Sequence, residues 1–240
     1  MPFSYNGALM LLSAAVIIFG AFTTLVMTAD MHRRRVGGHY VRLLAASLCF
    51  GLSATAMQFI GIFAIKLPVR VSYDPEMAAI AGVLPIAGGL IAFALSGSRK
   101  SGPAWLPISV VSLGVSLAGM HYIAMESISG AFTPRNSPLG IALTVFIAIQ
   151  AAFITLWLMF RERGVAQTLA SAGAIGAVIF IIHCAAMETT AFNVNKSLAG
   201  FAVPAISETV LSWAVAAGAY IFCSICLITF TIVQFGSDSR

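Results

Sequence analysis

Charged side chains are scarce in this sequence: they make up 9% of its 240 residues, whereas a soluble domain carries about 25%. Hydrophobic residues make up 60%, and the mean hydropathy is +0.98. So few charges exclude a soluble globular enzyme, a disordered tail and a nucleic-acid-binding protein, although the net charge is +5. The apolar residues instead form long blocks, which are typical of membrane spans.

Cysteine is also scarce, and its four positions do not indicate a disulfide framework. Cys49, Cys184, Cys223 and Cys226 all lie within or at the edge of apolar blocks. The last two form a CxxC pattern in the middle of a block, with no second pair nearby in sequence. That pattern alone is weak evidence for a metal or redox site.

Seven apolar blocks predict seven membrane-spanning helices. Each block lasts roughly 19–25 residues, enough to cross about 30 Å of hydrocarbon. Backbone polar groups in lipid must pair internally, which favours helices, and the short alternating segments of a barrel are absent from the sequence. We therefore expect an all-α, polytopic bundle forming one domain over residues 1–240. The predicted spans are Ala8–Thr28, Leu43–Ile65, Met77–Leu95, Trp105–Met125, Leu139–Phe160, Val165–Met187 and Val210–Val233.

Arginine and lysine are unevenly distributed between the connections, and this predicts the orientation. The first, third and fifth connections hold Arg33, Arg34, Arg35, Arg42, Arg99, Lys100, Arg161 and Arg163, whereas the others hold Lys66, Arg70, Arg135 and Lys196. Positively charged connections stay in the cytoplasm. We therefore expect the amino terminus outside and the carboxyl terminus in the cytoplasm.

An internal repeat relates three of the spans. The second, fourth and sixth end in Met57-Gln58-Phe59-Ile60-Gly61-Ile62, Met120-His121-Tyr122-Ile123-Ala124-Met125 and Ile182-His183-Cys184-Ala185-Ala186-Met187. Gln58, His121 and His183 are 63 and 62 residues apart, and a glycine (Gly51, Gly114, Gly176) stands seven residues before each. The repeat predicts one leading helix followed by three helix pairs, over about 41–103, 104–164 and 165–236.

Each pair crosses the membrane twice, so the three copies point the same way, around a pseudo-threefold axis along the membrane normal. The glycines allow helix backbones to approach closely at one level. We therefore expect Gln58, His121 and His183 to converge near the outer interface.

Met120-His121-Tyr122 and its threefold repetition resemble the MHYT domain, a bacterial integral-membrane sensor module. The resemblance implies a plasma-membrane protein with a copper site near the outer face, held by motif Met and His residues, that senses oxygen, carbon monoxide or nitric oxide. Many members are joined to cytoplasmic cyclic di-GMP enzymes, kinases or DNA-binding domains. The implied ligands are Met57, Met120, His121, Met125, His183 and Met187. The chain departs from the family pattern at Gln58 (for His), Ile62 and Ile182 (for Met), and Cys184 (for an aromatic residue).

The residue types suit this chemistry. His121 and Met125 are four residues apart, as are His183 and Met187, so each pair shares a helix face. Thioether and neutral imidazole ligands favour Cu(I). Supporting roles around the ligands are expected for Gln58, Tyr122, Cys184, Glu126 and Glu188. Two alternatives are haem b with His121 and His183 as axial ligands, and no cofactor, with polar side chains only bonding across the bundle. The other methionines, including Met10 and Met27, are interpreted as packing or lipid-facing residues.

The favoured function is a sensor in the lipid bilayer that responds to a diatomic gas or to redox state. No output domain follows residues 234–240, so either the signal passes to a separate cytoplasmic partner or this sequence is part of a longer chain. No acid–base pair, nucleophile–base arrangement or phosphate loop indicates an enzyme, and no nucleic-acid partner is expected. The alternatives are a metal-ion handling or transport protein and a degenerate module with a structural or partner-binding role.

Overall fold

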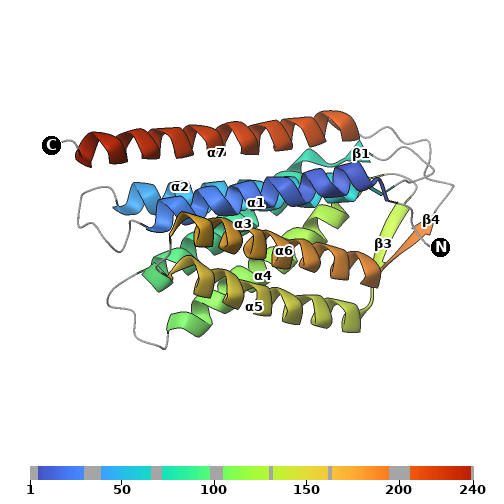
Figure 1. Cartoon of the computed structure of the whole chain (residues 1–240). Helices are drawn as coiled ribbons and strands as arrows, with labels where there is room; N and C mark the ends of the chain where they lie inside the picture. Colours follow the sequence, from blue (N-terminus) through green and yellow to red (C-terminus); the bar gives the residue numbers. More distant parts are fainter. Residues whose placement is uncertain are drawn as a thin grey trace.

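Seven long helices dominate the computed structural model, which describes residues 5–29, 39–65, 72–97, 105–129, 132–161, 164–194 and 206–238 (Figure 1). All seven are long and apolar enough to cross a membrane. The protein is therefore an all-α multi-pass membrane protein, as the sequence predicts. The helices are α1 (Gly7–Ala29), α2 (His39–Phe63), α3 (Pro75–Gly97), α4 (Trp105–Glu126), α5 (Pro138–Met159), α6 (Val165–Thr189) and α7 (Glu208–Asp238).

Short strands, which the sequence analysis did not predict, join the ends of the helices that carry the repeated motif. One sheet has the order β2–β1–β5 and consists of β2 (Ile128–Ser129), β1 (Ser72–Tyr73) and β5 (Ile206–Ser207). Tyr73 lies opposite both Ile128 and Ile206. The second sheet pairs β3 (Phe132–Asn136) with β4 (Thr190–Val194), antiparallel. Segments of two to five residues are too short for a readable alternation of polar and apolar residues.

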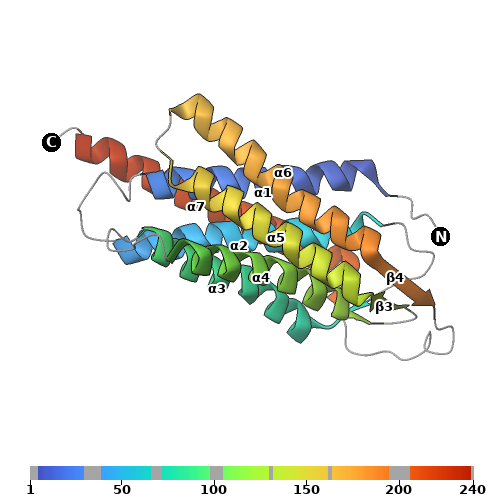
Figure 2. The same ribbon diagram turned by 90° about the horizontal axis from the view of Figure 1, so that it is seen from below.

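Helices α1 to α6 form a closed ring, in which each helix packs against the next and α6 packs against α1. The largest buried cluster lies inside this ring. Helix α7 packs against α1 and α2 on the outside. It lies on the side of the bundle opposite α5 (Figures 1 and 2).

The three repeated glycines lie where the helix that carries each motif meets an outer helix. The contacts are Gly51 on Ile86 of α3, Gly114 on Ile149 of α5 and Gly176 on Ile18 of α1. A Cβ added at any of the three would lie 2.7–3.2 Å from the backbone N and Cα of the isoleucine. Only glycine permits this approach, so the close packing predicted from the repeat is confirmed.

The helix that packs beside the third motif helix comes from the start of the chain. We expected the partner of α6 to follow it in the chain, but α1 occupies beside α6 the place that α3 takes beside α2. The sequence offset does not reveal this contact, because α1 lies outside the three predicted helix pairs.

Most of the residues that predict the orientation lie outside the described residues: Arg33, Arg34, Arg35, Lys66, Arg70, Arg99, Lys100, Arg163 and Lys196. Two of the described ones contact aromatic rings. The Arg42 guanidinium lies 4.8 Å from the ring centroid of Phe230 in α7, and that of Arg161 lies 5.0 Å from the ring of Trp157. These contacts are the same whichever side of the membrane they lie on, so the orientation of the chain in the membrane stays a prediction.

The glycine contact predicts a sharp difference between two substitutions. Gly114→Ala places a methyl group 2.8 Å from Cα of Ile149, and we expect the overpacking to lower the free energy of unfolding by about 1–3 kcal/mol. Gly173→Ala in α6 meets no atom within 4 Å and is expected to be neutral or stabilising, because alanine favours helices. Thermal unfolding of both variants in detergent measures the difference. Equal midpoints would contradict the proposed packing.

Candidate metal centre

Gln58, His121 and His183 meet inside the ring of helices, as the repeat predicts. The amide nitrogen of Gln58 donates to Nδ1 of His121 at 2.9 Å, and Nδ1 of His183 donates to the amide oxygen at 3.0 Å. The two imidazole centroids are 5.7 Å apart, and all three side chains are 1% exposed. The three residues lie five or six positions before their helices end, so they share one depth.

The single amide makes the two imidazoles inequivalent. An amide has one donor group and one acceptor oxygen, so one ring must accept at Nδ1 while the other donates there. With the amide in the assigned orientation, neutral His121 carries its proton on Nε2, and neutral His183 keeps a lone pair on Nε2. Within the described part of the chain, both Nε2 atoms are buried and have no hydrogen-bond partner. Such atoms are costly to leave unpaired. Nε2 of His183 has a lone pair and is a candidate ligand as it stands, whereas Nε2 of His121 could bind a metal only if its proton moved to Nδ1, which would break the bond from the Gln58 amide.

Gly61 of α2 fixes the position of the His183 ring. A Cβ added at Gly61 would lie 2.5 Å from Nε2 of His183, so a larger residue there would displace the ring. We did not predict a role for this glycine. The signal was present in the repeat, because the equivalent positions, Ala124 and Ala186, are also small and fully buried.

The methionines divide into two groups. Met57 and Met120 line the same closed space as His121 and His183, and the surrounding side chains leave no room there for a water molecule. Met187 lines a different cavity, on which His183 also borders. Met125 packs in an apolar cluster with Phe59 and Met187. The structure therefore brings four of the six expected ligands together and places Met125 and Met187 apart from them.

The expected supporting residues lie at various distances from the histidines. The Tyr122 ring contacts that of His121 edge-on, with centroids 5.3 Å apart, and its hydroxyl donates weakly to the backbone oxygen of Gly140 at 3.5 Å. Glu126 and Glu188 are exposed at the ends of their helices. Cys184 is partly buried beside the cavity of Met187.

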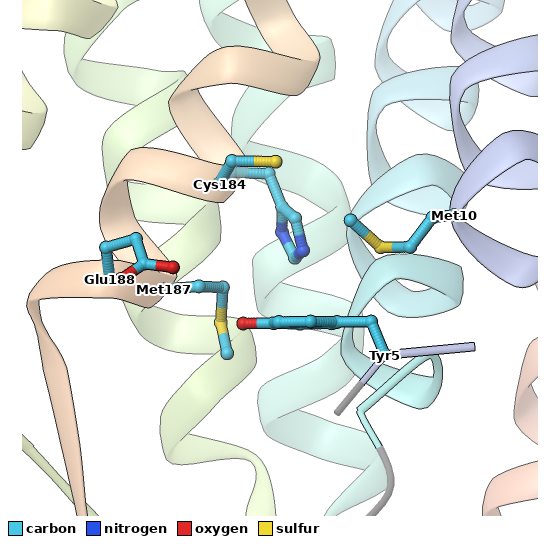
Figure 3. Close-up of a pocket in the computed structure, with 6 residues that line it drawn as sticks. Tyr5, Met10, Cys184, Met187 and Glu188 are labelled. Atoms are coloured by element: carbon cyan, nitrogen blue, oxygen red, sulfur yellow. The ribbon is translucent and has the colours of Figure 1, made fainter. Parts of the chain in front are cut away.

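That cavity has a volume of about 80 Å³ and brings α1 to the motif. Its lining consists of Tyr5, Met10, His183, Cys184, Met187 and Glu188, and the Tyr5 and Met187 side chains point toward one another (Figure 3). Tyr5 is held in place by its bridge to Ile65. Burial, the charge of Glu188 and Cys184 raise the pKa of the Tyr5 phenol, so it stays protonated and can donate. The sequence analysis gave neither Tyr5 nor Met10 a role at the site.

The remaining cysteines gather in another part of the bundle. Sγ of Cys223 donates to the backbone oxygen of Cys49 at 3.7 Å and lies 3.5 Å from Oγ of Ser53. Sγ of Cys49 lies 4.0 Å from Sδ of Met27. The CxxC pattern therefore has a neighbouring cysteine after all, because α7 packs against α2. Among the residues that the structure describes, no group of three or more His, Cys, Asp or Glu side chains is arranged to hold a metal ion.

Sequence comparison agrees with this architecture. The family model named MHYT, described as the "bacterial signalling protein N terminal repeat", matches residues 51–107 and 114–172. The first match contains Gly51 and Gln58, and the second contains Gly114 and His121. The chain belongs to the MHYT family, a family of membrane signalling modules.

Similar proteins act in bacterial signalling. The chain is 27% identical over 200 residues to the bifunctional diguanylate cyclase/cyclic di-GMP phosphodiesterase MucR of Pseudomonas aeruginosa, which covers 80% of this chain and 29% of that protein. It is 26% identical over 159 residues to the signaling protein YkoW of Bacillus subtilis (65% and 20%), and 25% identical over 191 residues to the cyclic di-GMP phosphodiesterase NbdA of P. aeruginosa (74% and 24%). The chain thus matches less than a third of the length of these relatives. No solved structure matches it.

The hydrogen bonds of Gln58 predict a cost for removing its amide. Gln58→Leu keeps the volume but leaves Nδ1 of both histidines unpaired, and we expect a loss of about 1–3 kcal/mol in the free energy of unfolding. Gln150→Leu on the exposed face of α5 is the matched control and is expected to be neutral. Thermal unfolding in detergent compares the two. A Gln58→Leu variant as stable as the control would show that the amide bridge does not form.

Proposed function

We propose that the protein is a membrane sensor that holds a copper ion through His121 and His183 and responds to a diatomic gas or to redox state. Membership of a signalling family and similarity to proteins of cyclic di-GMP signalling support the sensor role. The observation that carries the metal proposal is the pair of buried Nε2 atoms without hydrogen-bond partners, on two imidazoles joined by one amide.

The donor set fits copper. Two imidazoles and the thioethers of Met57 and Met120 line one closed space, and this soft, uncharged set favours Cu(I). A Cu(I) ion with an open coordination position supplies affinity for carbon monoxide, nitric oxide or oxygen. Haem b fits less well, because a space without room for water offers no slot for a macrocycle.

The protein's own contribution is to orient the ligands and to exclude water from them. Gln58 holds both rings through Nδ1. Its oxygen accepts from His183, as the outer partner of a metal-binding histidine usually does, whereas the bond from its nitrogen to His121 would have to break for Nε2 of that ring to bind the ion. Gly61 sets the position of the His183 ring. Since Gln58 joins α2 to α4 and α6 through these rings, a ligand that moves either ring would change how the three helices pack.

The signal would leave the ring through α2 and α7. Helix α2 carries Gln58 and also contacts α7, through Cys49 and Ser53 with Cys223 and through Arg42 with Phe230. In the orientation predicted from the basic residues, the carboxyl end of α7 reaches the cytoplasm. A separate or adjoining cytoplasmic signalling protein would read the position of α7. Such coupling needs a ligand that binds one packing state better than the other.

Metal-ion handling is a second candidate function, because a cavity with sulfur ligands adjoins His183. The two functions differ in a cellular measurement. Copper accumulation that depends on His121 and His183 would favour handling or transport, whereas an unchanged copper content with an altered cyclic di-GMP response would favour the sensor.

The copper proposal predicts metal in the purified protein. We expect detergent-purified full chain, offered Cu(I) under reducing conditions, to retain copper and to lose it in the double variant His121→Asn/His183→Asn. The control is His39→Asn, at the first residue of α2 and outside the motif. Elemental analysis and optical spectra make the measurement. A wild-type protein that binds no copper would contradict the copper centre. A Soret band in the optical spectrum would indicate haem in place of copper.

Placing at position 58 the histidine that the family has there is expected to raise the affinity for Cu(I). Gln58→His adds a third imidazole at the same depth, and we expect Cu(I) to bind about tenfold more tightly, equal to about 1.4 kcal/mol. Gln150→His on the exposed face of α5 is the control. Competition against a Cu(I) chelator measures both affinities. Weaker binding in Gln58→His would mean that the amide serves the metal better than a third ring.

A further inference from the structure

We propose that Met10, Cys184 and Met187 form a second binding site, for a soft monovalent cation such as Cu(I) or Ag(I), in the cavity beside His183. Its role as the entrance through which the ion reaches His183 rests on the proposed function. The binding itself does not, because the site uses residues outside the space between the two histidines.

The cavity collects sulfur from two helices. Met10 comes from α1, whereas Cys184 and Met187 lie three residues apart on one side of α6. The thiol of Cys184 and the thioethers of Met10 and Met187 surround the same space of about 80 Å³ (Figure 3). Two thioethers and a thiolate are ligands that select Cu(I) and similar soft ions. Two sulfur atoms of different helices bound to one ion would also fix α1 against α6.

His183 connects this cavity to the inner space. It borders both the sulfur-lined cavity and the closed space that holds Met57, Met120 and His121. The ring is 1% exposed, and its Nε2 has no hydrogen-bond partner among the described residues. A buried ligand atom without a partner is thus present in the wall between the two. An ion held by the sulfur atoms needs to exchange only one ligand to reach His183.

The charges of the lining suit a cation. Glu188 is exposed and supplies a negative charge, and neither lysine nor arginine is among the lining residues. Tyr5 remains a neutral phenol and adds a polar oxygen. Binding of Cu(I) by Cys184 as a thiolate releases one proton, which passes to Glu188 or to water. No electron is transferred in this step.

The site belongs to the third motif copy alone. The positions equivalent to Cys184 are Phe59 and Tyr122, and those equivalent to Met187 are Ile62 and Met125. Neither of the other copies therefore has a cysteine followed three residues later by a methionine. The motif helix of the third copy, α6, packs against α1, which supplies Met10.

The test measures protection of Cys184 by Ag(I) alone, in reduced, detergent-purified full chain without chloride. After a short pulse of maleimide, peptide mass spectrometry reads the alkylation of each cysteine. We expect one equivalent of Ag(I) to slow the alkylation of Cys184 about tenfold relative to Cys226, which is also partly buried. Met10→Leu is expected to raise the Ag(I) concentration for half protection about tenfold. Met77→Leu, on an exposed face of α3, is the control and is expected to leave it unchanged.

Equal protection in Met10→Leu and Met77→Leu would overturn the proposal, because Cys184 would then bind Ag(I) as an isolated thiol. Met187→Leu is a second variant that must behave like Met10→Leu, so a folding defect in one variant does not decide the result. The same assay in His121→Asn separates the two proposals. Protection that depends on Met10 there supports the sulfur site even if the wild-type protein retains no copper between the histidines, and then only the entrance role fails.

Discussion

One amide, that of Gln58, holds the interior of this bundle together at the level of the motif. It belongs to α2 and bonds to His121 of α4 and His183 of α6, so a single side chain links three helices that are distant in sequence. Backbone polar groups are satisfied within each helix in a membrane, and side chains must supply the specificity between helices. Where the repeat would place three identical groups, the chain has a donor and an acceptor in one residue, and the two rings beside it are chemically different.

The glycine contacts make this convergence possible. Gly51, Gly114 and Gly176 draw each motif helix onto an outer helix at the same height, which leaves the central residues facing inward. Close backbone packing replaces the hydrophobic driving force that is lacking between helices in lipid. The three glycine contacts therefore repeat around the ring, whereas the side chains at its centre and the sulfur-lined cavity beside the third copy do not.

The sequence predicts the parts of this structure that repeat or that extend over many residues. The seven spans, the glycine contacts and the meeting of Gln58 with both histidines follow from hydropathy and from offsets of 62–63 residues. The partner of α6, the neighbour of the CxxC pattern and the cavity formed by Tyr5 and Met10 do not. Each of these depends on a contact with α1 or α7, which lie outside the repeated motif, and no periodicity in one chain indicates where such helices pack. Of the expected ligands, Met125 shows the limit of helical spacing: four residues after His121, it packs with Phe59 instead.

The position of α7 has a mechanical consequence. Because the six-membered ring closes without it, α7 touches the rest of the bundle along one side, on α1 and α2. A rearrangement inside the ring therefore reaches α7 from two adjoining helices and not from all around. An expansion that is radial at the centre becomes a tilt in a single direction at the rim, and any protein attached to or resting on the end of α7 would receive it as an angular displacement.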